Sequence, residues 1–217
     1  VFLGMGKPKN STFSEGHPFY PGEEYELKYT TYDPDFANQL LDDLGLVDTD
    51  GDGFRNRTDG SGNLTIELAY YSLSSLNNEL IAQLIKEDFA MVGVDTLLKL
   101  EEAALFFERR AANAHQLVVA RSSDRHPLSM TTGYDSWYAY GYWYFLGKQT
   151  NGSIERPTAD PTGDPTFLRV VELTDMSLQL LYADRADVYK ELQQLNIDNQ
   201  WFIGIVGDTV VPNGLAM

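Results

Sequence analysis

Residues 64–121 carry the clearest pattern of hydrophobic and polar positions in the chain. The run LTIELAY at 64–70 alternates apolar and polar residues, which predicts a strand with one buried face. Apolar residues then recur at helical spacing up to Gly93, where a residue without Cβ favours a left-handed helix end. The serines of SLSSLNN, at 72–78, are the candidate caps of this helix. Its predicted buried face consists of Leu80, Ile81, Leu84, Ile85 and Phe89.

A second strand and a second helix follow at once. VDTLLKL at 94–100 predicts the strand, and EEAALFFERRAANAH at 101–115 predicts the helix, with acidic residues at its start and Arg109 and Arg110 near its end. QLVVAR predicts a third strand at 116–121. Two strand–helix–strand units in tandem predict a parallel sheet with right-handed crossovers. Ligands of such sheets bind beyond the carboxyl ends of the strands, so the residues after Tyr70, Leu100 and Arg121 are candidate functional positions.

Helices and connections are predicted on both sides of this core. Residues 1–32 are punctuated by proline and glycine, which predicts an extended connection. Asp33 and Pro34 form a helix start, and Gly45 marks its end. Asp-Pro recurs at 164–165 and begins the first of two helices over about 164–200, and WFIGIVGD predicts a buried return strand at 201–207. The sequence therefore predicts an α/β fold with a mainly parallel sheet.

The segment DTDGDGFRNRTD, at 48–59, has the spacing of a twelve-residue calcium loop. Its last position is an aspartate rather than glutamate, and a strand rather than a second helix follows, so a bound Ca²⁺ would be structural. The alternative is an Asp- and Gly-rich turn without a metal. The candidate ligands are Asp48, Asp50, Asp52, the Phe54 carbonyl, Asn56 and Asp59.

Residues 122–151 are unusually rich in tyrosine and tryptophan. Aromatic rings with polar tips suit a recognition surface, because they give a large contact area and still form hydrogen bonds. The alternative is that several of these rings pack over the sheet.

Charge and composition exclude some classes of function. The 217 residues are 43% hydrophobic and carry a formal net charge of −16, which argues against a nucleic-acid partner. There is no cysteine and no apolar run of membrane-spanning length, and the chain begins at Val1 without a signal peptide, as expected of a fragment of a longer protein.

Enzymatic motifs are not found in the sequence. The three histidines do not form a zinc-binding pattern, and there is no nucleophile elbow, phosphate loop or dinucleotide fingerprint. Acidic pairs such as Asp42 and Asp43 lie at predicted helix surfaces. We therefore expect a binding protein and not an enzyme.

Several segments, in this order, resemble the C-terminal lobe of bacterial extracellular solute-binding proteins of family 5, the peptide- and nickel-binding receptors of ABC importers. The resemblance covers about residues 20–213. It rests on TYDPDFANQLLDDLGL, DTDGDGFR, LTIELAYY, KEDFAMVGVDTLLKL, FFERRAANAHQLVVA and QQLNIDNQWFIGIVGDTVVPNG.

The resemblance implies a lobe like that of type II periplasmic binding proteins. This lobe would span 33–217, with its core at 64–121, an aromatic cleft loop at 122–151, helices at about 164–200 and a return strand at 201–207. Residues 1–32 would connect it to a large N-terminal lobe outside this chain. The whole receptor would be a monomer in the periplasm or lipid-anchored at the cell surface. It would capture a small solute, with an oligopeptide expected, and deliver it to an ABC permease.

The family also implies where the ligand binds. After the third strand its members often read Gly-Trp, then an acidic residue that can hold a ligand amino group, then Asp-Pro. ARSSDRHPLS at 120–129 makes Asp124 the counterpart of that acid, whereas Arg121-Ser122 and His126-Pro127 depart from the pattern. Arg121, Arg125 and the aromatic residues that follow would equally suit an anionic or aromatic ligand. The candidate ligand-binding residues are Ser122, Ser123, Asp124, Arg125, Tyr134, Trp137 and Tyr138.

Two other functions remain open from the residues alone. A secreted carbohydrate-binding or carbohydrate-active domain would use the aromatic segment. A calcium-stabilised structural or adhesion domain would use residues 48–59.

Overall fold

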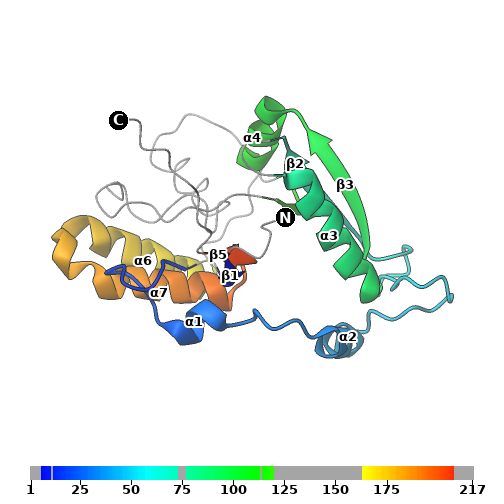
Figure 1. Ribbon diagram of the computed structural model, residues 1–217, viewed down its shortest axis with the longest axis horizontal. Helices are drawn as coiled ribbons and strands as arrows, with labels where there is room; N and C mark the ends of the chain where they lie inside the picture. The colour runs from blue at the N-terminus through cyan, green and yellow to red at the C-terminus, as the bar shows by residue number, and fades with distance from the viewer. Residues whose placement is uncertain (1–5, 11, 73–76, 113, 120–162, 208–217) are drawn as a thin grey trace. The chain divides into compact units, whose positions relative to one another are not determined.

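The computed structural model describes residues 6–10, 12–72, 77–112, 114–119 and 163–207. The chain divides into two compact units (Figure 1). The first contains Tyr32–Arg121, and the second combines Phe2–Thr31 with Ser122–Met217. The sequence predicted a single lobe from residue 33 onward. In the structure, the early residues instead group with the late helices.

A three-stranded parallel sheet organises the first unit, as the sequence predicted. β2 (Thr65–Tyr71) lies in the middle, β3 (Asp95–Glu101) pairs with it over seven residues, and β4 (Leu117–Val118) pairs on its other side. The crossovers are α3 (Asn78–Met91) and α4 (Ala103–Ala111). The chain moves from β2 to β3 on one side and then returns past β2 to β4 on the other side. Because the two crossovers run in opposite directions across the sheet, right-handed connections place the two helices on opposite faces.

The alternation along β2 decides what each helix covers. Leu68 and Tyr70 point to one face and pack with Ala82 of α3. Tyr71 points to the other face and contacts the ring of Phe106 of α4, with centroids 4.7 Å apart. The core of this unit is therefore a thin layer on each side of the sheet.

The ends of α3 are set by two local signals. Its cap is Asn77, whose side chain accepts a hydrogen bond from the Leu80 N–H at 3.0 Å. The sequence proposed serines for this role, but Asn77 stands directly before the first helical residue. Gly93 has a φ of 76° and ends the helix as predicted, because this left-handed conformation costs glycine little.

α2 (Pro34–Asp43) begins and ends as the sequence predicted. Asp33 caps it by accepting from the Phe36 N–H at 2.9 Å, and Gly45 follows with a φ of 74°. Arg55 attaches this helix to the sheet unit, since its guanidinium bonds Asn38 of α2 and the Val92 carbonyl after α3. The large apolar side chains along and just after α2 are not buried in this structure; the most exposed are Phe36, Leu40 and Leu44.

Two antiparallel helices are the longest elements in the described part of the second unit. α6 (Pro165–Gln179) starts at the predicted Asp-Pro, where Asp164 accepts from the Thr166 N–H at 2.8 Å. A 3-10 turn, η2 (Tyr182–Asp184), replaces the predicted start of the second helix, and α7 (Ala186–Asp198) begins after it. The core between them is built from Phe19, Val170, Leu173, Val188, Tyr189 and Leu192.

Residues predicted as an extended connection pack into this second core. They contain β1 (Lys7–Pro8) and α1 (Glu23–Leu27). Phe19 is 1% exposed and stacks on Tyr189 with ring centroids 4.5 Å apart. The buried Gln193 amide accepts from the Phe13 N–H and donates to the Phe19 carbonyl, which satisfies the irregular backbone.

The return strand predicted at 201–207 is shorter and less buried than expected. Only β5 (Val206–Gly207) forms, antiparallel to β1, and Ile203 and Ile205 are exposed. The prediction was wrong at its start because the backbone there bonds to the end of α7. The Trp201 N–H donates to the Asn196 carbonyl, and the Phe202 N–H donates to the Asn196 side chain.

Candidate ligand-binding edge

The three parallel strands end at the same edge of the sheet. β2 ends at Tyr71, β3 at Glu101 and β4 at Val118. Ligands of open parallel sheets bind at this carboxyl edge, so the side chains around it form the candidate site in the described part of the chain.

Aromatic rings of α4 cover the end of β2. The Tyr71 ring lies 4.7 Å from Phe106 and 5.2 Å from Phe107, centroid to centroid. Phe106 is 1% exposed and also lies against His115, at 5.0 Å. These contacts fix the end of α4 nearest the edge.

The first turn of α3 is bound to the end of β2. Asn78 is 2% exposed, and its side-chain N–H donates to the Tyr71 carbonyl at 2.7 Å. This bond ties the strand to the following helix across the segment 72–77.

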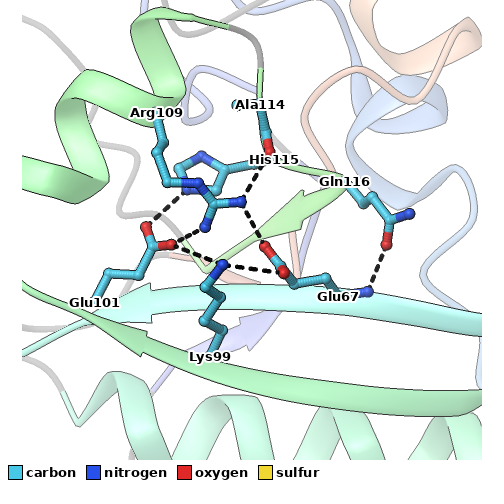
Figure 2. A network of polar contacts seen from close by, with 7 residues as sticks. All are labelled: Glu67, Lys99, Glu101, Arg109, Ala114, His115 and Gln116. Atoms are coloured by element: carbon cyan, nitrogen blue, oxygen red, sulfur yellow. Dashed lines mark hydrogen bonds and ion pairs between the residues drawn. The ribbon is translucent and has the colours of Figure 1, made fainter.

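A network of charged side chains lies between α4 and the sheet (Figure 2). Glu101 is almost fully buried and is bonded by Arg109, and its second oxygen lies 2.9 Å from His115 Nε2. Because a carboxylate can only accept, His115 carries its proton on Nε2. Lys99 Nζ lies 3.7 Å from Glu101 and 3.2 Å from Glu67.

Glu67 is the second carboxylate of this network. It accepts from Arg109 Nη2 at 2.9 Å, and its own backbone N–H donates to the Gln116 side chain at 2.6 Å. Burial raises the pKa of Glu67, but hydrogen bonds and charges from Arg109 and Lys99 outweigh it and leave that pKa below the ordinary value. Glu67 is thus held as an anion paired with two cations.

His115 is held in the neutral form. Desolvation by burial lowers its pKa, and the positive charge of Arg109 lowers it further. Its Nδ1 is buried and has no hydrogen-bond partner among the described residues. A proton on Nδ1 would therefore find no acceptor, so acid opposes this arrangement.

Three carboxylates gather in the predicted calcium loop. Asp48, Asp50 and Asp52 each have an oxygen within 4.8 Å of the others, and all three are exposed. Asp48 accepts from the Gly51 and Gly53 N–H groups at 2.7 and 2.9 Å, and these bonds lower its pKa. The arrangement matches positions 1, 3 and 5 of the loop.

The other predicted ligands are engaged elsewhere or remain untested. The Asn56 side-chain oxygen accepts from both the N–H and the hydroxyl of Thr49, at 2.6 Å each. Asp59 pairs with Arg57 at 3.1 Å and with the Ser61 hydroxyl at 2.6 Å. The Phe54 N–H donates to Asp52 at 2.8 Å. The donor set thus fits one half of a calcium site, and calcium binding stays a prediction.

Residues 1–145 match the model of a protein family described as bacterial extracellular solute-binding proteins, family 5 middle. The match covers more than half of the 217 residues and includes the whole parallel sheet. The chain belongs to this family. No curated protein sequence matches it.

Solved structures of family 5 and related binding proteins share the fold. An oligopeptide-binding protein OppA is 25% identical with a TM-score of 0.76, and the match covers 95% of this chain and 34% of the OppA chain. AppA from Bacillus subtilis, solved with a nonapeptide, is 16% identical with a TM-score of 0.63, covering 94% and 37%. MelB from Agrobacterium fabrum, solved with stachyose, is 21% identical with a TM-score of 0.59, covering 82% and 26%.

The fold is thus an α/β fold of the type II periplasmic binding proteins, as predicted. The family 5 chain spans about a third of the length of the solved structures it matches. None of its described helices is long and apolar enough to cross a membrane.

The ligand-binding residues predicted for this family 5 chain lie outside the described residues. They are Ser122, Ser123, Asp124, Arg125, Tyr134, Trp137 and Tyr138. The first of them, Ser122, comes four positions after the end of β4 in the sequence.

The sequence analysis did not predict the charged network between α4 and the sheet. It assigned Glu101 to the start and Arg109 to the end of one helix, where their charges suit the helix dipole. The alternation in the strands held a usable signal, since Glu67 and Lys99 interrupt apolar runs on the same face of paired strands.

Proposed function

We propose that this chain is part of the substrate-binding component of an ABC importer. The observation that carries the proposal is the family match over residues 1–145. In this role the protein captures a small extracellular solute in a cleft between two lobes, and the lobes close around the bound ligand. It works as a monomer outside the cytoplasm, in the periplasm or lipid-anchored at the cell surface, and passes its ligand to a membrane permease. No chemical step is needed.

An oligopeptide is the ligand class that we favour. The solved structures support it in part, because OppA and AppA are oligopeptide-binding proteins and AppA was solved with a nonapeptide. Asp124 then pairs with the amino terminus or a basic side chain of the peptide, and the nearby aromatic residues pack on its side chains. The net charge of −16 also favours cationic peptides over anionic ones.

A carbohydrate ligand is the alternative, and two neighbours solved with sugars, MelB and an oligopeptide-binding protein from Thermotoga maritima with mannohexaose, support it. MelB was solved with stachyose, so this fold accepts sugars in at least one relative. Tyr134, Trp137 and Tyr138 would then stack on sugar rings. The two ligand classes differ in what Asp124 contributes, since an uncharged sugar gains no ion pair from it.

Thermal unfolding of the full-length protein tests the proposal. The ligands are trilysine, trialanine and stachyose, each compared with buffer alone. A ligand that binds only the folded state must raise the melting temperature by mass action. We expect trilysine to give the largest rise. A rise with stachyose and none with either peptide would favour the sugar ligand, and no rise with any peptide or sugar would reject the proposal.

A further inference from the structure

Three consecutive residues that lead into β4 are each held by a different side chain or strand. Figure 2 shows these bonds converging from α4, β2 and β3. The bonds measure 3.0, 2.9 and 2.6 Å in chain order. The held residues are Ala114, His115 and Gln116, and their respective partners are Arg109, Glu101 and Glu67.

The described part of the β4 backbone ladder is short. Up to Val119, the last described residue on this side, β4 pairs with β2 over two residues, whereas β3 pairs with β2 over seven. One further bond, from the Val119 N–H to the Ala69 carbonyl at 2.9 Å, continues the ladder. The side-chain contacts at the start of β4 therefore add to these backbone bonds in placing the described part of the strand.

Arg109 is the centre of these contacts. One guanidinium bonds the carboxylates of Glu67 and Glu101 and the carbonyl of Ala114 at the same time. Only the planar fork of arginine offers donors in three fixed directions, and a lysine ammonium on a flexible stem does not reproduce them. The Glu101 side chain is 1% exposed, so the free-energy cost of burying its negative charge must be offset by these partners.

We propose that Arg109, together with Glu101 and His115, positions β4 and thereby sets the affinity for the ligand bound at its carboxyl end. The inference rests on the proposed function, because it needs a ligand at this edge. Arg109 acts through β4 and is a positioning residue rather than a ligand contact. Losing it leaves the sheet and its helices in place but lets the end of β4 shift.

The same contacts make ligand affinity sensitive to acid. In the described part of the chain the Nδ1 of His115 has no hydrogen-bond partner, and the Phe106 ring lies against the imidazole. A second proton would put an unmatched N–H inside the network and loosen the link to Glu101. The charged groups that face His115 from the elements packed around it are Glu67 of β2, Lys99 and Glu101 of β3, and Arg109 and Arg110 of α4.

The first test measures trilysine binding to the full-length protein by titration calorimetry. The variant Arg109→Lys keeps the charge and removes the fork. Arg169→Lys is the matched control, because Arg169 also bridges two glutamates, at 2.6 Å each, but lies in α6 of the second unit. We expect Arg109→Lys to weaken binding by about tenfold, which corresponds to roughly 1.4 kcal/mol, and Arg169→Lys to leave it unchanged.

The second test separates positioning from general loss of structure. His115→Gln keeps a side-chain donor for Glu101 but does not titrate near neutral pH. When the pH falls from about 7.5 to about 5.5, this variant should lose a smaller fraction of its own trilysine affinity than the wild type loses. Because this variant is expected to fold, it decides the matter even if Arg109→Lys does not.

The possible failures are distinct. If the wild type binds none of trilysine, trialanine and stachyose, the proposed function fails and this inference falls with it. If the wild type binds trilysine while Arg109→Lys binds equally well, or while His115→Gln keeps the full acid response, the inference alone is overturned.

Discussion

The imidazole of His115 donates from Nε2 to Glu101 at 2.9 Å, and both side chains are more than nine-tenths buried. The two residues are fourteen positions apart and meet because α4 returns the chain to the sheet. Their contact closes the connection between α4 and β4, next to the edge where the ligand is proposed to bind.

Neutralising Glu101 should destabilise the protein strongly. Glu101→Gln leaves Arg109 and Lys99 facing an uncharged group inside the network. We expect a loss of about 3 kcal/mol in the free energy of unfolding, measured with urea. The control Glu108→Gln changes an exposed residue of α4 and should stay within about 0.5 kcal/mol. Equal effects of the two changes would show that the network contributes little.

Stability should rise with pH across the histidine range. Burial lowers the pKa of His115 in the folded state relative to 6.5, so the unfolded state binds more protons between the two values. The contribution of neutral His115 to the free energy of unfolding is therefore complete above about pH 6.5. It is lost as the pH falls toward the pKa of His115 in the folded state. Urea unfolding at several pH values measures it, and His115→Gln should flatten the profile. An unchanged profile in that variant would contradict the assignment.

Gly93 should be less replaceable than Gly51, although their φ angles, 76° and 78°, are almost the same. A Cβ at Gly93 would lie 3.0 Å from the Arg55 Cγ, whereas a Cβ at Gly51 meets nothing within 4 Å. Gly51→Ala should cost about 1 kcal/mol for the left-handed backbone alone. Gly93→Ala should cost more, because Arg55 must also move away from α2. Urea midpoints compare them, and equal costs would mean that Arg55 adapts freely.

Asp124 should contribute directly to the binding of a cationic ligand. In the full-length protein, Asp124→Ala is expected to weaken trilysine binding by about tenfold, through loss of a charge-assisted contact. Asp175→Ala, at an exposed position of α6, is the control. Titration calorimetry reports both affinities. Wild-type affinity in Asp124→Ala would remove this residue from the site.

Calcium should stabilise the loop at 48–59 if its three carboxylates hold the ion. Melting in calcium is then higher by a few degrees than melting in EGTA, by mass action. Asp50→Asn should abolish the difference while leaving the Asp48 bonds that shape the turn. Identical melting with calcium and with EGTA would favour a plain Asp-Gly turn.

The order of elements could be predicted from the sequence because local patterns determine it. Alternation at 64–70, helical spacing before Gly93 and Asp-Pro at two helix starts each act within a few residues. Predictions failed where distant groups compete for the backbone. Asn196 binds the chain at 201–202 and prevents the predicted strand, and Phe19 draws a proline-rich segment into a core with Tyr189.

The candidate site could be predicted only in its location. The carboxyl edge follows from the strand order, but the pairing of Glu101 with Arg109 and His115 depends on how α4 packs on the sheet. The positions of charged residues along a strand do not show which helix residue will pair with them. The calcium loop shows the converse, since its spacing predicts six ligands whereas Asn56 and Asp59 bond to neighbours.

Native mass spectrometry of the full-length protein mixed with trilysine and stachyose tests the central claim most directly. It reports which molecule the folded protein retains, and in what ratio. We predict a one-to-one complex with trilysine that is weakened in Asp124→Ala and in Arg109→Lys. A protein that retains neither molecule, or only stachyose, would contradict a peptide-binding role.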